Sequence, residues 1–229
     1  MAQQQWKRLA DISDRNLTPM LRQYLQAKAE CQDSLLFFRM GDFFEMFFDD
    51  AIDAAQILGL TLTSRDGGGK DDRVPMCGVP FRNVDTYVAR AIKAGRTVTI
   101  CDQVEDPKDA KGIVKRAVVR TITPGTVMEP NLLEETVNNY LAALAHQDGV
   151  AGLAFVDVTT GEFLAAQIDG DVDRVLFDEL TRMAPVEVIV PKGTDDKLVA
   201  HLERRFETIT FTKRSEDDFD TDTARDRIL

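Results

Sequence analysis

LLFFRMGDFFEMFFDDA, residues 35–51, holds six of the chain's 13 phenylalanines within twelve consecutive positions. Its first part, Leu35–Met40, is an apolar run of buried-strand length that ends at a Gly-Asp turn signal. Phe43 and Phe44 follow on adjacent positions, and adjacent side chains of an extended chain point to opposite faces. One of these two rings is therefore expected to point outward, with Glu45 on the same side as Phe43.

A run this aromatic is either core or contact surface. Large aromatic side chains are mostly buried, so a strand and a turn that fill a core are the ordinary interpretation. The alternative is an exposed phenylalanine paired with a carboxylate, which would form a contact site.

Length and composition indicate a globular protein of more than one domain. At 229 residues the chain exceeds the usual domain length of about 100 to 150 residues, so two domains are expected. No apolar run approaches the ~18 residues of a membrane span, and the first residues lack the apolar block of a signal peptide. Three well-separated cysteines, Cys31, Cys77 and Cys101, suit a reducing compartment better than a disulfide scaffold or a zinc site. These features predict a cytoplasmic protein.

The net charge of −11 is unevenly distributed. Residues 1–125 carry 18 Lys/Arg against 17 Asp/Glu, whereas residues 126–229 carry 10 against 22. Phosphate binding depends on Lys and Arg, so the acidic second half is a poor partner for nucleic acid. The near-neutral first half could touch DNA, but weakly and with help from other parts.

Hydrophobic spacing and turn residues predict the remaining elements of the first half. Residues 1–17 are polar and are expected to form a mobile arm. The predicted helices and strands are helices at Thr18–Glu30, Asp49–Gly59 and Asn83–Gly95, and strands at Leu60–Ser64, Thr97–Val104 and Val114–Ile122. The predicted connections are a charged loop at Arg65–Arg73, a tight Pro/Gly segment at Val74–Pro80, and a turn at Thr123–Thr126 that closes the first domain. The charged loop is not a phosphate loop, because Asp71 follows Lys70 where the Walker pattern needs Ser or Thr.

The second half begins with a predicted hairpin and continues with alternating helices and strands. Its expected elements are strands at Ala151–Val158, Glu162–Ile168, Val186–Val190 and Ile209–Thr212, and helices at Asp171–Met183 and Asp195–Phe206. This order predicts a mixed sheet whose parallel part is covered by helices. The final residues, FDTDTARDRIL, are expected to enter a helix rather than to complete a domain, as at the boundary of a fragment.

Few residues offer catalytic chemistry. The two histidines, His146 and His201, lie near no Ser or Cys nucleophile signature. An enzyme interpretation starts from Asp157, since strand carboxylates in a ribonuclease-H-like sheet can hold two metal ions for phosphodiester cleavage. Glu162 and Glu179 could join it, although the sequence does not bring the three together convincingly.

Four segments occur in an order and spacing that resemble the start of the bacterial MutS family, the DNA mismatch-recognition ATPases. They are residues 35–51, VPMCGVPFRNVDTYVARAIKAG (74–95), ICDQVEDPKDAKGIVKRAVVRTITPGT (100–126) and FVDVTTGEF (155–163). The resemblance implies an α/β fold of two domains, a mixed β-sheet domain with flanking helices followed by a ribonuclease-H-like connector domain without nuclease activity. The implied boundaries are an arm at 1–17, the mismatch-recognition domain at 18–126, a linker at 127–135 and the connector domain at 136–229, the last expected to be incomplete.

The family's Phe-x-Glu motif falls on Phe43, Phe44 and Glu45, with Phe44 at a position where the family usually has Tyr. The resemblance implies that Phe43 is a wedge that stacks on a mispaired base and that Glu45 hydrogen-bonds that base. Arg82 is implied to lie near the DNA backbone, with Arg65 and Met76 beside the same groove. Weaker candidates for DNA contact are Lys70, Lys111, Arg116 and Arg120, for which a solvated surface is the ordinary interpretation.

The implied partners are mismatched double-stranded DNA and other mismatch repair proteins. The family's lever, clamp and ATP-binding domains are absent from these residues, so ATP and Mg²⁺ belong to the full-length family and no cofactor or catalysis is expected here. The chain itself is expected to be a monomer, and the parent protein a homodimer. A metal-dependent nuclease and a protein-interaction module remain as alternatives.

Overall fold

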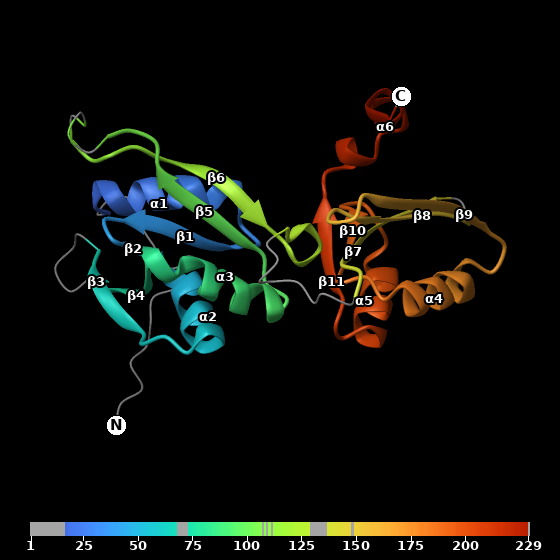
Figure 1. Ribbon diagram of the computed structural model, residues 1–229, viewed down its shortest axis with the longest axis horizontal. Coiled ribbons are helices and arrows are strands. Elements are labelled where there is room, and N and C mark those ends of the chain that lie inside the picture. The colour runs from blue at the N-terminus through green and yellow to red at the C-terminus, as the bar shows by residue number, and fades with distance from the viewer. Residues whose placement is uncertain are drawn as a thin grey trace. The chain divides into compact units, whose positions relative to one another are not determined.

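The computed structural model describes residues 17–67, 73–106, 108, 110, 112–128, 137–147 and 149–228 (Figure 1). These residues form two mixed β-sheets with flanking helices, the α/β class that was predicted. The chain divides into two compact units between Ile122 and Thr123. Residues 1–16 of the predicted arm and 129–135 of the predicted linker lie outside the described residues. None of the described helices is long and apolar enough to cross a membrane.

The first unit contains a six-stranded sheet in the order β3-β4-β2-β1-β5-β6. Its strands are β1 (Leu35–Met40), β2 (Phe43–Phe47), β3 (Thr63–Asp66), β4 (Arg73–Pro80), β5 (Val98–Gln103) and β6 (Arg116–Ile122). The β1–β5 pair is parallel and the other neighbours are antiparallel, which makes the sheet mixed. The aromatic stretch thus supplies two adjacent strands at the centre of the sheet.

Helices cover the two faces of this sheet (Figure 1). The helix α1 (Pro19–Glu30) begins at Thr18, whose Oγ1 accepts a hydrogen bond from the Leu21 amide at 3.3 Å. The ring of Tyr24 on α1 packs edge-on against Phe38 and Phe47. The opposite face, which carries Cys77 and Val79, is covered by α2 (Phe48–Leu58) and α3 (Val84–Lys93). The three predicted helices of this half are confirmed, although Asn83, at the N-cap of α3, makes no side-chain capping hydrogen bond.

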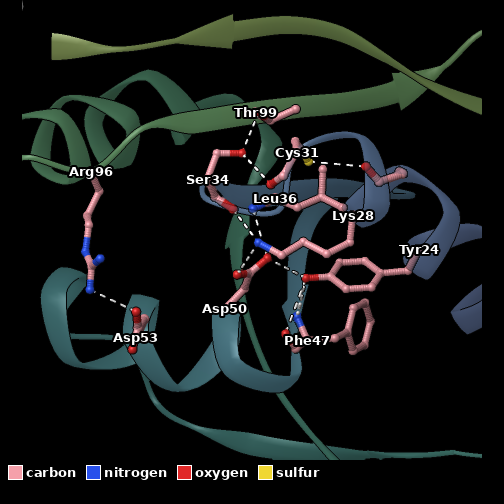
Figure 2. A network of polar contacts seen from close by, with 11 residues as sticks. Tyr24, Lys28, Cys31, Ser34, Leu36, Phe47, Asp50, Asp53, Arg96 and Thr99 are labelled. Carbon is pink, nitrogen blue, oxygen red and sulfur yellow. Dashed lines mark hydrogen bonds and ion pairs between the residues drawn. The ribbon is translucent and has the colours of Figure 1, made fainter. Parts of the chain in front are cut away.

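A buried polar network connects α1 with α2 and β1 (Figure 2). Lys28 Nζ lies 2.8 Å from Asp50 Oδ1. Asp50 Oδ2 accepts hydrogen bonds from the Tyr24 hydroxyl at 2.8 Å and from the Leu36 amide at 3.1 Å. A single carboxylate of α2 therefore holds both the helix on the other side of the sheet and the strand between them.

Two predictions about the segment 60–80 are wrong. The strand expected at Leu60–Ser64 is β3, which begins at Thr63 and includes Arg65, so the start of the expected loop is a strand; residues 68–72 of that loop lie outside the described residues. The Pro/Gly segment is the eight-residue strand β4, where Pro75 lies opposite Ser64. Proline disfavours an internal strand because it lacks the N–H group. Here Cys77 and Val79 are buried beneath α2 and α3, and Val74 is buried in the core beneath α1, and this burial outweighs the local preference.

The second unit contains a five-stranded sheet in the order β11-β10-β7-β8-β9. Its strands are β7 (Tyr140–Gln147), β8 (Val150–Asp157), β9 (Glu162–Asp169), β10 (Glu187–Pro191) and β11 (Thr210–Arg214). The predicted hairpin, the parallel part and the helices α4 (Val172–Met183) and α5 (Asp196–Arg205) are confirmed. The central strand β7 was not predicted. A short helix, α6 (Thr221–Ile228), follows as expected.

The Thr123–Thr126 turn is a 3-10 helix, η4 (Pro124–Thr126), and it packs against β7 and β10 of the second unit. The Thr123 and Thr126 side chains form a reciprocal cap at its start. The Gly125 amide donates to Glu187 Oε2 at 3.0 Å, and Thr212 Oγ1 donates to the other carboxylate oxygen at 2.8 Å. Glu187 is buried, so this carboxylate fixes the turn to the sheet.

Candidate nucleic-acid interface

The exposed ring expected in the aromatic stretch is Phe43, the first residue of β2. Its side chain is 47% exposed whereas that of Phe44 is 2% exposed, so the predicted alternation of the two rings is confirmed. Phe43 lies opposite Met40 in β1 and Pro80 in β4. Neighbouring strands on both sides hold its backbone although much of its ring is open to solvent.

A tight turn places Phe43 at the end of the hairpin. Gly41 and Asp42 connect β1 to β2, and Gly41 has a φ of 58°. This left-handed conformation is one that residues with a Cβ atom rarely adopt, which explains the glycine. This two-residue turn fixes the start of β2, which carries Phe43, relative to the end of β1.

Glu45 points to the same face as Phe43 and forms an ion pair with Arg65. Glu45 lies opposite Gly78 of β4, and Arg65 lies opposite Val74 of the same strand, so both side chains leave one face of the sheet. Burial raises the pKa of Glu45, and the Arg65 guanidinium offsets part of this rise. The site therefore pairs an exposed ring with a half-buried carboxyl group that takes up a proton more readily than an exposed glutamate does.

Gly78 and Met76 of β4 complete this face. A Cβ atom at Gly78 would lie 3.3 Å from the Phe44 carbonyl oxygen and 3.5 Å from Glu45 Cγ, so the glycine leaves room for the carboxylate. Sequence reasoning did not single out Gly78. Met76 lies opposite Phe47 and packs, half-buried, against the core beneath α1. It shares the face of Glu45 and lies two residues before Gly78 on β4.

The basic candidates occupy different surroundings. Arg82 is exposed on the short 3-10 helix η3 (Phe81–Asn83), two residues after Pro80, which pairs with Phe43. Arg116 is half-buried and donates to the Arg39 carbonyl at 2.5 Å and to Gln23 Oε1 at 2.9 Å. Its guanidinium therefore forms hydrogen bonds within the protein. Arg120 is exposed on β6. Lys70 and Lys111 lie outside the described residues.

Asp157, the starting point of the nuclease hypothesis, organises the turn between β8 and β9. Its carboxylate accepts hydrogen bonds from the Thr159 amide at 2.9 Å, the Thr159 hydroxyl at 2.6 Å and the Asn139 amide at 3.2 Å. Burial raises the pKa of Asp157, but these hydrogen bonds outweigh it and hold the pKa below its ordinary value. The residue is buried and its oxygens are occupied, which describes a structural carboxylate.

The other two carboxylates of that hypothesis also have local partners. Glu162 accepts hydrogen bonds from the Tyr140 hydroxyl and from Asn138 Nδ2, and Glu179 on α4 pairs with Arg182 one turn away. Within the described part of the chain, no group of three His, Cys, Asp or Glu side chains could hold a metal ion. The convergence of three carboxylates that the nuclease alternative requires is not found among these residues.

Comparison with known proteins accounts for nearly the whole chain. Residues 18–131 match the model of MutS domain I, and residues 139–228 match that of MutS domain II. Proteins named DNA mismatch repair protein MutS are 43% identical over 204 residues in Clostridium botulinum strain Langeland, 51% over 187 residues in Pelotomaculum thermopropionicum and 50% over 202 residues in Bacillus licheniformis. These alignments cover 89%, 81% and 88% of this chain but only 22%, 21% and 23% of the relatives. The chain spans about a fifth of the length of these relatives, and it belongs to the MutS family, whose domains I and II it comprises.

Proposed function

We propose that the first unit recognises mispaired bases in double-stranded DNA, with Phe43 as the wedge and Glu45 as the discriminating group. The observation that carries this proposal is an exposed phenylalanine ring on a central strand with a half-buried carboxyl group on the same face. The names of the relatives support mismatch repair as the setting.

The wedge role follows from the cost of opening a base stack. Inserting an apolar ring between base steps costs a few kcal/mol and kinks the duplex. This cost is smaller where pairing is already broken, so the ring enters most easily at a mismatch. Stacking on an aromatic ring tolerates any base, which lets one phenylalanine serve many mismatches.

The carboxylate adds selectivity against intact DNA. A negative charge near the phosphates repels a perfect duplex, in which no base edge compensates for it. A displaced base can offer an N–H donor to the carboxylate, or an acceptor to the protonated carboxyl group. We infer that Phe43 probes deformability while Glu45 favours displaced bases.

Replacing Phe43 with alanine is the direct test. We expect the affinity for a duplex with one G·T mismatch to fall by about 1–3 kcal/mol, the value of one aromatic–base stack, with little change for the perfect duplex. Fluorescence anisotropy at low salt measures both affinities. Phe163→Ala is the matched control, since this ring is 59% exposed but lies in the second unit. A wild-type chain without mismatch preference, or an equal loss on both duplexes, would contradict the proposal.

Replacing Glu45 with glutamine is expected to tighten binding to the perfect duplex and to reduce the ratio of mismatched to perfect affinity. Asp42→Asn is the control, because it removes an equal charge from the neighbouring turn without touching the carboxyl group. The same anisotropy assay applies. An unchanged ratio in Glu45→Gln, or an equal change in Asp42→Asn, would count against the role of Glu45.

The pH dependence provides a second check on Glu45. Because burial raises the pKa of this carboxyl group above its ordinary 4.5, it begins to take up a proton at a higher pH than an exposed glutamate. Lowering the pH toward the raised pKa of Glu45 should make the wild type resemble Glu45→Gln, with rising affinity for the perfect duplex. The glutamine variant should lack this pH-dependent component of binding.

We propose that the remaining functions of the family require parts of the full-length protein other than these residues. ATP and Mg²⁺ are proposed to act in the full-length protein, and this chain is proposed to be non-enzymatic. Other mismatch repair proteins are proposed as partners of the acidic second unit, in the cytoplasm. We propose that the chain alone is a monomer, whereas the parent protein is a homodimer.

A further inference from the structure

Arg39, the residue before the last position of β1, holds the hairpin that presents Phe43. Its guanidinium carbon lies 3.4 Å from the centre of the Phe81 ring and 5.4 Å from that of Phe44. Its Nε donates a hydrogen bond to the Gly41 carbonyl at 2.5 Å. The Arg39 side chain thus contacts both the turn and the rings of Phe44 and Phe81.

Further hydrogen bonds hold the same short segment. The Phe81 amide donates to the Asp42 carbonyl at 2.8 Å, so the ring on which Arg39 stacks is itself attached to the turn. Arg116 Nε donates to the Arg39 carbonyl at 2.5 Å. The carbonyls of residues 39, 41 and 42 therefore each accept a hydrogen bond from a different group.

The register places Arg39 on the opposite side of the sheet from Phe43. Arg39 lies directly opposite Phe44 across the β1–β2 pair, whereas Phe43 lies opposite Met40. Directly paired residues share a face, so the Arg39 side chain lies on the face opposite to the one that carries Phe43 and Glu45. The Arg39 guanidinium has its partners within the protein, two aromatic rings and a carbonyl oxygen, so its position does not require a phosphate.

We propose that Arg39 is a positioning residue for the Phe43 wedge, an inference that rests on the proposed function. A ring can separate stacked bases only if its own backbone does not yield first, because a hairpin end that bends would move the ring aside instead of opening the stack. Arg39 supplies this resistance by joining the turn to Phe81 and Phe44. Sequence reasoning missed it because the stacking depends on Phe81, which lies 42 positions along the chain.

Arg39→Lys and Arg39→Gln test this role in the 229-residue chain. Lysine keeps the charge but lacks the planar guanidinium and its Nε donor, so both variants should lose the ring stacking and the hydrogen bond to the Gly41 carbonyl. We expect the ratio of G·T-mismatched to perfect affinity to fall about threefold to tenfold in both variants, with an unchanged dependence of binding on salt. Arg90→Gln is the control, since the Arg90 guanidinium carbon lies 5.6 Å from the centre of the Tyr87 ring on α3, and its loss removes the same charge and a cation–ring contact away from the hairpin.

Amide hydrogen exchange of the free protein, followed by NMR, gives a readout independent of DNA. Exchange at the Phe81 amide, which donates to the Asp42 carbonyl at 2.8 Å, should accelerate at least threefold in both Arg39 variants and remain unchanged in Arg90→Gln. The inference is overturned if Arg39→Lys keeps the mismatch ratio, or if exchange at the Phe81 amide is unchanged. It is also overturned if affinity for both duplexes falls equally with a weaker salt dependence, which would make Arg39 a phosphate contact.

The two proposals fail in different ways. If Phe43→Ala leaves the mismatch ratio unchanged, the wedge is wrong, whatever the exchange data show for Arg39. If Phe43→Ala abolishes the ratio while the Arg39 variants keep it, the proposed function stands and the positioning role is wrong.

Discussion

Asp50→Ala is expected to destabilise the first unit by about 3–5 kcal/mol, because it leaves the ammonium of Lys28 buried without its counter-charge. The side chains of Lys28 and Asp50 are 11% and 9% exposed, so water cannot replace the lost carboxylate. Asp50 Oδ2 also accepts from the Tyr24 hydroxyl and the Leu36 amide (Figure 2), so the variant leaves the hydroxyl with only the Phe47 carbonyl at 3.3 Å and removes the acceptor of the amide. This one carboxylate of α2 therefore makes polar contacts with both α1 and β1.

A matched control lies one turn along the same helix. Asp53 pairs with Arg96 at 2.9 Å, but these side chains are 46% and 47% exposed, so Asp53→Ala should cost less than about 1 kcal/mol. Urea unfolding followed by hydrogen exchange of peptides from residues 35–58 measures both variants. Equal losses for Asp50→Ala and Asp53→Ala would show that burial does not strengthen the Lys28 pair.

Gly125→Ala is expected to destabilise the second unit by about 2–4 kcal/mol. The added Cβ atom would lie 2.9 Å from both Cβ and Cδ1 of Leu141 and 3.1 Å from Glu187 Oε2, so the turn must move away from the sheet. That movement stretches the hydrogen bond from the Gly125 amide to Glu187, and a buried carboxylate that loses a donor adds to the cost.

Gly152→Ala is the control for this substitution. Gly152 is in β8 of the same unit, and a Cβ atom there would meet no atom within 4 Å. We expect it to be neutral or slightly stabilising, since alanine restricts the unfolded chain more than glycine does. Hydrogen exchange of peptides from residues 140–157 should report the loss in Gly125→Ala, while peptides from residues 35–58 should not change. A loss of similar size in Gly152→Ala would refute the steric explanation.

Local patterns were sufficient to predict much of the fold. The helices α1, α2 and α4 have caps and apolar faces that can be recognised within a dozen residues. The strand β4 could not be predicted this way, because its two prolines argue against a strand and only the helices on its two faces explain it. The strand β7 is rich in alanine, a residue with a weak preference for strands, so its pairing with β8 and β10 depends on the complete sheet.

The candidate site was predictable only in part. The alternation of Phe43 and Phe44 is a property of any extended chain, so adjacent residues were enough to predict one exposed ring. The Glu45–Arg65 ion pair, the space at Gly78 and the stacking of Arg39 depend on the registers of three or more strands. Such registers are set by contacts between residues far apart in the chain, which hydrophobic periodicity does not encode.

The place of β2 within its sheet has a mechanical consequence for the proposed wedge. A ring that separates two stacked bases is pushed back with equal force, and that load passes into the strand that carries it. Because β2 is hydrogen-bonded to β1 on one side and β4 on the other, the load is shared by three strands, and bending β2 would require breaking two ladders at once. The same ring on an edge strand such as β3 or β6 would rest on one ladder and would be more compliant.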